Sequence, residues 1–310
     1  LRAGGCLSDE LNGGCPTPGR FLPADQQMAR VASPSQHSIQ CLFVTRPIDA
    51  QENAYFVRLG PHCYSPTEHA GGTWRADELH LAPVAGRVVH EMERWRQAHL
   101  DPAMRFSRFS FELLGQIPRG TIEMHTEVVR PGRTIELIET TMTIGRVIIR
   151  GRAWLLSTED TSAVAGSPFD PLPDPETQPD FRMSDIWPGG FIASLRGKRV
   201  GPVEPGRGCA WLTTDVELVT GEPVSPLASF CALVDAANGI AIRQKPTDWM
   251  YPNVEWTVHL FTQPQGRWVG LDTRVSFGPD GLGLTSSVLH DLRGPVGMLQ
   301  QSLTVRPLHT

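Results

Sequence analysis

The chain has 310 residues, with 28 Lys and Arg against 33 Asp and Glu, a formal net charge of −5 and a pI of about 6.1. Its basic residues form no dense block, which argues against a nucleic-acid surface. No apolar run approaches the roughly 18 residues of a membrane span, and the N-terminus lacks the basic start and apolar core of a secretory signal. We therefore expect a cytoplasmic protein without membrane insertion, in which the six scattered cysteines are free thiols.

The segment 1–50 is rich in Gly, Pro, Ser and Gln and shows no sustained periodicity. Such a composition buries too little apolar area to offset the entropy lost on ordering. We expect a disordered leader here. Because the chain starts at Leu1, Met28 is one candidate for the true start.

The segment 51–158 has the pattern of a strand, a long helix and an antiparallel run of strands. The helix is expected to start near Pro83, because proline suits a first turn, and its apolar stripe leaves Glu91, Arg94 and Arg96 largely outside. The strands are expected at residues 55–59, 105–117, 121–129, 134–144 and 147–157.

The segment 159–208 is dense in proline, which excludes a regular element over most of its length and predicts a linker between two domains. The segment 209–310 then repeats the order of the first. It predicts a strand at 210–219, a helix at 226–242 and strands at 253–261, 268–277, 282–290 and 296–306. One long helix followed by antiparallel strands, given twice, indicates an internal duplication.

The last predicted strand carries a polar residue on its apolar face. Gln301 shares a face with Leu299 and Leu303, because successive side chains of a strand point to opposite sides. A buried amide without a partner costs about 1–3 kcal/mol, so a polar group should meet it. Asp235 borders the apolar stripe of the predicted 226–242 helix, where partial desolvation would raise its pKa. We predict that Asp235 and Gln301 meet; the alternative is a solvated carboxylate and a satisfied core amide.

The order of elements and these residues together resemble the acyl-CoA thioesterase II family and related thioesterase-like proteins, over about residues 52–307. The resemblance implies an α+β double hot-dog fold, in which two antiparallel sheets each wrap around a long central helix. It implies hot-dog domains at 51–158 and 209–310. It also implies three catalytic residues that orient a water: an Asp, matched by Asp235, a Gln, matched by Gln301, and a Thr or Ser, where this chain has Asn253.

Further candidates surround these three. Asn253 can donate or accept a hydrogen bond but is not a hydroxyl. Asn238 and Gly239 close the motif that begins at Val234, and Glu255 stands where the family has an Asp, so they are candidates for substrate contact. His259 is a fourth such candidate, since the strand pattern puts it on one face with Asn253 and Glu255; a structural role is the alternative.

The first half lacks the catalytic pair. Repeat spacing puts Arg152 at the position of Gln301, and His90 or Glu91 at that of Asp235. We therefore expect the first half to be a structural partner that helps to shape the acyl pocket.

Other chemistries lack their motifs. The chain has no G-x-S-x-G elbow and no phosphate-binding loop, and its histidines show no metal-ligand spacing, so no metal and no cofactor are implied. The resemblance implies that an activated water hydrolyses an acyl-CoA substrate to free acid and CoA. The alternative is a non-catalytic hot-dog protein that binds an acyl or aromatic ligand. Assembly into homo-oligomers stays open.

Overall fold

The computed structural model describes residues 53–99 and 103–308, so the expected leader lies outside the described residues. The first half contains β1 (Ala54–Gly60), β2 (Cys63–Pro66), α1 (Leu81–His99), β3 (Met104–Leu113), β4 (Ile122–Arg130), β5 (Ile135–Ile144) and β6 (Arg146–Ser157). The connection contains β7 (Asp180–Phe181), α2 (Gly190–Ala193) and β8 (Leu195–Glu204). The second half contains β9 (Arg207–Thr214), β10 (Glu217–Val219), α3 (Pro226–Val234), α4 (Ala237–Ile240), β11 (Trp249–Met250), β12 (Glu255–Leu260), β13 (Val269–Phe277), β14 (Leu282–Asp291), β15 (Gly294–Thr304) and β16 (Arg306–Pro307).

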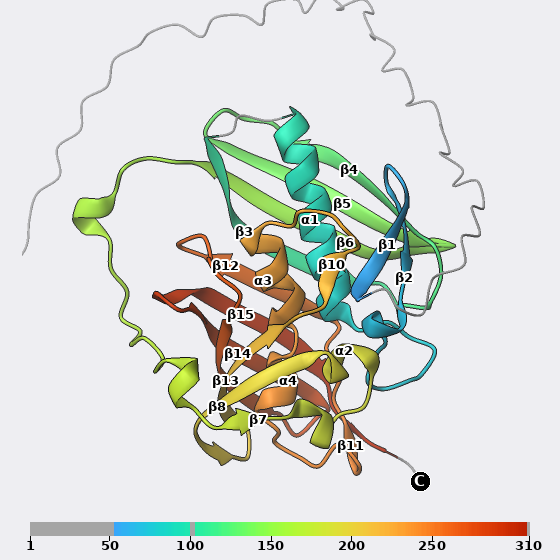
Figure 1. Ribbon diagram of the computed structural model, residues 1–310, viewed down its shortest axis with the longest axis vertical. Helices are drawn as coiled ribbons and strands as arrows, with labels where there is room; N and C mark the ends of the chain where they lie inside the picture. The colour runs from blue at the N-terminus through green and yellow to red at the C-terminus, as the bar shows by residue number, and fades with distance from the viewer. Residues whose placement is uncertain (1–52, 100–102, 309–310) are drawn as a thin grey trace, which may run out of the picture. The chain divides into compact units, whose positions relative to one another are not determined.

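Hydrogen bonds join fourteen of these strands into one mostly antiparallel sheet (Figure 1). Its order is β10-β1-β2-β4-β5-β6-β3-β12-β15-β14-β13-β9-β8-β7, and β11 pairs separately with β16. The two halves meet where β3 pairs with β12, with Phe109 opposite Val258. The sequence predicted two sheets; instead, this pairing joins the strands of both halves, and it satisfies backbone groups that an open strand edge would expose.

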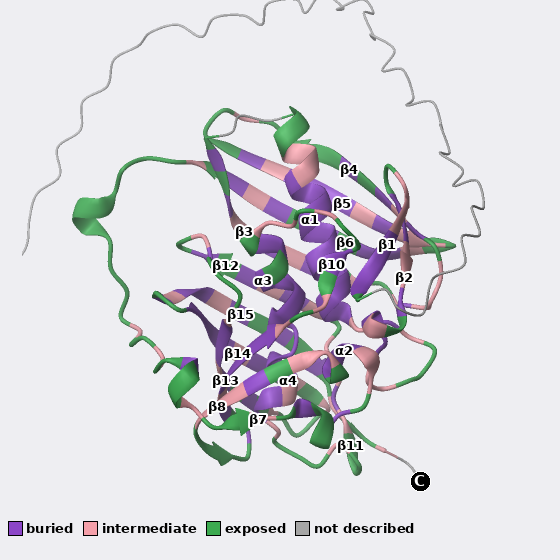
Figure 2. Cartoon of the chain, in the orientation of Figure 1, coloured by how far each residue is buried: buried purple, intermediate pink, exposed green. Residues whose placement is uncertain are grey.

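The two longest helices, α1 and α3, pack side by side (Figure 1). Their close approach needs Gly86, because a Cβ there would lie 2.4 Å from the Cβ of Ala232. Buried residues of both helices and of both halves of the sheet share one hydrophobic core. Helix α1 is buried continuously from Leu81 to Glu93, so both of its faces are covered (Figure 2). The expectation that Glu91 lies outside is therefore wrong, since it is only 3% exposed.

The proline-dense connection is more regular than the sequence predicted. The ten-residue strand β8 lies within it and pairs antiparallel with β9, with Lys198 opposite Trp211. Most of the connection lacks a strand or α-helix, as expected, and β8 is the main exception because the prolines of this stretch fall outside the paired residues. Pro202, the only proline of β8, lies in the interval where the register with β9 shifts.

The helix predicted over 226–242 is divided at Asp235. Helix α3 ends at Val234 and α4 begins at Ala237. Between them the hydrogen bonds tighten to three-residue spacing, from the Ala236 N–H to the Leu233 carbonyl and from the Gly239 N–H to the Ala236 carbonyl. The predicted 210–219 strand is also divided, and its second part, β10, leaves β9 and pairs in parallel with β1.

Two smaller points complete the comparison with the sequence. Cys209 and Cys231 are free thiols, whereas Cys63 is disulfide-bonded, which corrects the expectation at that residue; spacing along the sequence gave no sign of the pairing. Across residues 53–99 and 103–308, no helix combines the length and apolarity that a bilayer span needs.

Candidate active site

The carboxylate of Asp235 lies at the junction of α3 and α4 and is held by two amides. Its Oδ1 accepts a hydrogen bond from Nδ2 of Asn253 at 2.8 Å and from Nε2 of Gln301 at 2.8 Å. Asp235 is 5% exposed and Gln301 is fully buried. The expected meeting of Asp235 and Gln301 is therefore present in the structure, although the two residues are 66 positions apart in the chain.

The local backbone explains how each amide reaches Asp235. Gln301 alternates inward with Leu299 and Leu303 along β15, as the sequence pattern predicted. Asn253 precedes β12 and forms an isolated bridge with Leu303. Because Asn253 lies outside the regular strand, its side chain is free of the alternation that governs the strand residues.

Burial sets the protonation of Asp235. Burial raises the pKa of Asp235 to about 7, and the hydrogen bonds from Asn253 and Gln301 act in the opposite direction because they favour the ionised form. A carboxyl group that titrates near neutrality is suited to accept a proton from water and to release it again. Since both amides bind Oδ1, the other oxygen, Oδ2, is the one left for a reactant.

A histidine approaches that second oxygen. Nδ1 of His80 lies 3.6 Å from Oδ2 of Asp235, and the same nitrogen accepts the backbone N–H of Ala82 at 3.1 Å. Burial lowers the pKa of His80 to about 3, so the imidazole is neutral and carries its proton on Nε2. The contact with Asp235 is consequently not an ion pair. His80 instead caps the first turn of α1, and its ring packs on Phe191.

Two cavities border Asp235. The larger has a volume of about 360 Å³ and is lined mainly by apolar side chains, including Leu81, Leu113 and Ile117. Arg75 and Arg306 also line it. The smaller, of about 50 Å³, lies against Trp187, Asn238 and Gly239. The side chains that line both cavities are Thr73, Trp74, His80, Asp235 and Asn253.

The candidate contact residues divide between two places. Asn238 and Gly239 lie at the smaller cavity, where Asn238 Nδ2 donates to the carbonyl of Tyr251 at 2.9 Å. Glu255 and His259 line a different cavity together with Thr257. Because β12 starts at Glu255, its alternation turns these side chains away from the buried face. The expectation that His259 shares a face with Asn253 is wrong.

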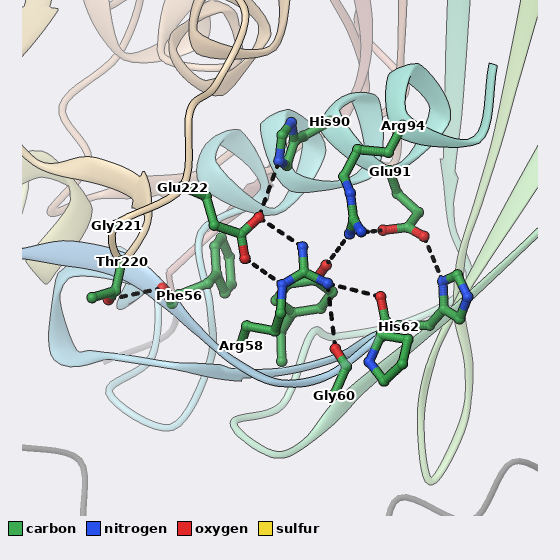
Figure 3. Close-up of polar contacts among 12 residues, drawn as sticks. Phe56, Arg58, Gly60, His62, His90, Glu91, Arg94, Thr220, Gly221 and Glu222 are labelled. Carbon is green, nitrogen blue, oxygen red and sulfur yellow. Dashed lines mark hydrogen bonds and ion pairs between the residues drawn. The ribbon is translucent and has the colours of Figure 1, made fainter. Parts of the chain in front are cut away.

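His90 and Glu91, which repeat spacing puts at the position of Asp235, belong to a charged network in the first half (Figure 3). The guanidinium of Arg58 donates two hydrogen bonds to the carboxylate of Glu222, and His90 Nε2 lies 3.4 Å from the same carboxylate. Glu91 accepts a hydrogen bond from His62 at 2.7 Å. Arg152, at the position of Gln301, pairs with Glu139 at 2.6 Å and is half exposed. These groups neutralise one another, so the first half has no counterpart of the Asp235 and Gln301 pair.

In the part of the chain that the structure describes, no three His, Cys, Asp or Glu side chains gather as metal ligands.

Two domain families match the sequence. The N-terminal domain of acyl-CoA thioesterases matches residues 71–156, and the C-terminal domain of acyl-CoA thioesterases matches residues 168–305. Together these matches span most of the chain. The chain belongs to the acyl-CoA thioesterase family. The C-terminal match begins upstream of β8, which agrees with the pairing of that strand to β9.

Solved structures show the fold of this acyl-CoA thioesterase family member. A candidate thioesterase from Novosphingobium aromaticivorans has a TM-score of 0.60 at 18% identity, over 81% of this chain and 98% of that chain. A candidate thioesterase II from Thermobifida fusca has a TM-score of 0.60 at 20% identity, over 81% and 95%. A hot-dog protein from Alicyclobacillus acidocaldarius has a TM-score of 0.62 at 13% identity, over 81% and 94%. The chain therefore has a hot-dog fold. No curated protein matches the sequence.

The first half and the connection of this thioesterase-family chain contribute site residues that the sequence pattern did not predict. His80 stands directly before α1, and a side-chain acceptor at a helix start is a signal that could have identified it. Thr73 and Trp74 follow the Gly71-Gly72 pair in a loop that carries no periodicity. Trp187 lies in the proline-dense connection. Only the folded chain shows that Thr73, Trp74 and Trp187 line the smaller cavity beside Asp235.

Proposed function

We propose that this chain is an acyl-CoA thioesterase that hydrolyses an acyl-CoA thioester to a free acid and CoA, with Asp235 as the general base. In this reaction Asp235 takes a proton from a water molecule that Gln301 and Asn253 help to orient. The water oxygen bonds to the thioester carbonyl carbon, the carbon–sulfur bond breaks, and the proton held by Asp235 passes to the thiolate that leaves. No external oxidant or cofactor is needed to balance these steps.

The observation that carries the proposal is the environment of one carboxylate. Asp235 is buried, titrates near neutrality, has one oxygen fixed by two amides and borders a largely apolar cavity of about 360 Å³. A carboxylate that only stabilised the fold would gain more from an ion pair or from exposure to water than from this position.

The first turn of α1 is placed to help the reaction. Leu81 lines the larger cavity, and α1 begins at this residue. The N–H of Ala82 is occupied by His80, and Pro83 has no N–H, so Leu81 supplies the remaining donor of this helix end. A backbone N–H at the positive end of a helix stabilises the negative charge that develops on a thioester oxygen.

The polar rim of the larger cavity fits the CoA portion of the substrate. Arg75 and Arg306 line the cavity, and the guanidinium of Arg306 donates a hydrogen bond to Sδ of Met250 at 3.0 Å. We also infer that residues 51–158 and 209–310 are two hot-dog units, each built on its own helix, and that β7 and β8 of the connection extend the second unit. A cytoplasmic location and homo-oligomer formation stay predictions.

A thiol-release assay over a panel of acyl-CoAs tests the function. Asp235→Asn is expected to lower kcat by roughly 10²–10⁴-fold, the usual contribution of a positioned acid–base group. Gln301→Ala should also lower kcat while the melting transition is retained. His259→Ala is the matched control, because its side chain lies on the outer face of β12, and its rates should stay within about twofold of wild type.

The outcomes separate the two candidate functions. Hydrolysis by the wild type that both site variants lose supports the thioesterase. A panel with no hydrolysis, together with acyl-CoA binding measured by calorimetry, contradicts it and supports the non-catalytic binding protein.

A further inference from the structure

We propose that the smaller cavity beside Asp235 is a water site that supplies the hydrolytic water, with Thr73 and Asn238 as its positioning residues. This inference rests on the proposed function. It assigns different tasks to the two cavities that meet at Asp235: the larger takes the thioester, and the smaller takes only water.

Unsatisfied polar atoms mark the smaller cavity. Oγ1 of Thr73 and Oδ1 of Asn238 are buried and have no hydrogen-bond partner among the described residues. The amide of Asn238 cannot turn to improve this, because its Nδ2 is held by the carbonyl of Tyr251. A buried polar atom left without a partner costs about 1–3 kcal/mol. A water molecule between Thr73 and Asn238 removes that cost for both.

The size of the cavity fits water and excludes substrate. Its volume of about 50 Å³ compares with about 30 Å³ for one molecule in liquid water, so it admits one or two waters. Asp235 and Asn253 also line it, so a water there is within reach of the proposed base.

The smaller cavity gives water a separate route to Asp235 during the reaction. Each turnover consumes one water, and a thioester that fills the larger cavity displaces solvent from that side of the carboxylate. Water that reaches Asp235 from the smaller cavity remains available while substrate is bound. The larger cavity can then keep the apolar surface that its Leu, Ile and Trp side chains supply for the acyl chain, beside its polar rim.

The walls of the smaller cavity are held together by ring packing and a hydrogen bond. Trp187 packs edge-on against Trp74, with ring centres 5.3 Å apart, and its Nε1 donates to the carbonyl of Gly239 at 3.0 Å. The segment that carries Trp187 is anchored to the first half at Gly190, where a Cβ would come within 1.9 Å of the Glu68 carbonyl oxygen. This contact holds the connection against the loop that contains Thr73.

Two variants of Thr73 test the inference in the full chain. Thr73→Val keeps the shape of the side chain and removes the hydroxyl, and we expect kcat to fall roughly tenfold with KM unchanged, since tenfold corresponds to about 1.4 kcal/mol of barrier. Thr73→Ser keeps the hydroxyl and should retain kcat within about twofold. A crystal structure of the wild type should show a water bonded to Thr73 Oγ1 and Asn238 Oδ1.

Three results would overturn the inference: equal kcat for Thr73→Val and wild type, a Thr73→Val effect confined to KM, or a crystal structure without water in the smaller cavity. The crystal structure also keeps this test separate from that of the function. A wild type that hydrolyses no acyl-CoA contradicts the proposed function, and the electron density then decides by itself whether Thr73 and Asn238 bind water.

Discussion

At the scale of single residues, two opposing effects set the pKa of Asp235. Burial favours the neutral carboxyl group, while the amides of Asn253 and Gln301 favour the carboxylate. The balance puts the pKa at about 7, compared with an ordinary value of 3.8. Neighbouring His80 adds no charge, because burial keeps its imidazole neutral. The reactivity of the site is therefore set by amides and burial rather than by an ion pair.

The pH dependence of kcat/KM should report this carboxyl group. A general base must be ionised, so kcat/KM is expected to rise with pH through about 7 and to level off above it. Asn253→Ala removes a hydrogen bond that favours the ionised form, so the midpoint should move to higher pH. Rates measured from pH 5 to 9 check both; a midpoint close to 4 in the wild type would contradict the assignment of Asp235.

Much of the site follows from the sequence, and the rest depends on the fold. Strand alternation alone places Gln301 inward, and the helical stripe places Asp235 at a buried border. The same rule fails for Asn253, because β12 begins only at Glu255 and an irregular residue obeys no alternation. The contribution of Thr73 arises from packing of the first half on the second, which has no local signature, whereas His80 could have been found from its place at the start of α1.

At the scale of elements, the contact between α1 and α3 sets the distance between the helices. The Gly86 position faces Ala232 so closely that no side chain fits, and His80 at the start of α1 lies beside Asp235 at the end of α3. The packing distance of the two helices therefore also fixes the geometry of the site.

Gly86→Ala tests this contact. Alanine is intrinsically favoured over glycine in a helix by about 1 kcal/mol, but an added Cβ would also lie 2.8 Å from the Cα of Ala232, so the helices must separate. Overpacking of this kind costs about 1–3 kcal/mol, and we expect a net loss of stability in urea unfolding. The control Gln97→Ala, on the exposed end of α1, should change stability by less than about 0.5 kcal/mol. Stabilisation by Gly86→Ala would refute the close contact.

Elements with a strong period were predictable, and those made by tertiary pairing were not. The strands β4, β5, β6, β13 and β14 lie within about two residues of their predicted bounds, as expected for boundaries. Strand β8 lacks a clean alternation and is stabilised by its pairing with β9, next to the short edge strand β7. The break in the 226–242 helix at Asp235 and Ala236 was likewise not predictable, because neither residue is a proline or a glycine.

At the scale of the whole molecule, the halves are joined by more than the connection between them. Strand β10 of the second half pairs with β1 of the first, and β3 pairs with β12. The fork of Arg58 on Glu222 adds a charged link between residues 164 positions apart (Figure 3). These contacts join the two halves directly, so we expect them to unfold together.

Glu222→Gln tests the charged link. The variant leaves the guanidinium of Arg58, which is 26% exposed, without its carboxylate, and we expect a loss of roughly 1–3 kcal/mol in urea unfolding. Asp215→Asn is the control, because Asp215 and its partners Arg196 and Arg267 are at least 60% exposed and such surface pairs contribute less than about 1 kcal/mol. Equal effects of the two substitutions would show that the Arg58 fork contributes no more than a surface pair.

The parallel pairing of β1 with β10 has a consequence for synthesis on the ribosome. Strand β1 emerges early, yet its outer edge waits for residues 217–219, which follow the whole connection. Until then the nascent chain presents an open strand edge, a template for pairing with the wrong partner. Completion of the first half is thereby tied to translation of the second, and we expect a chain truncated between them to aggregate more readily than the full chain.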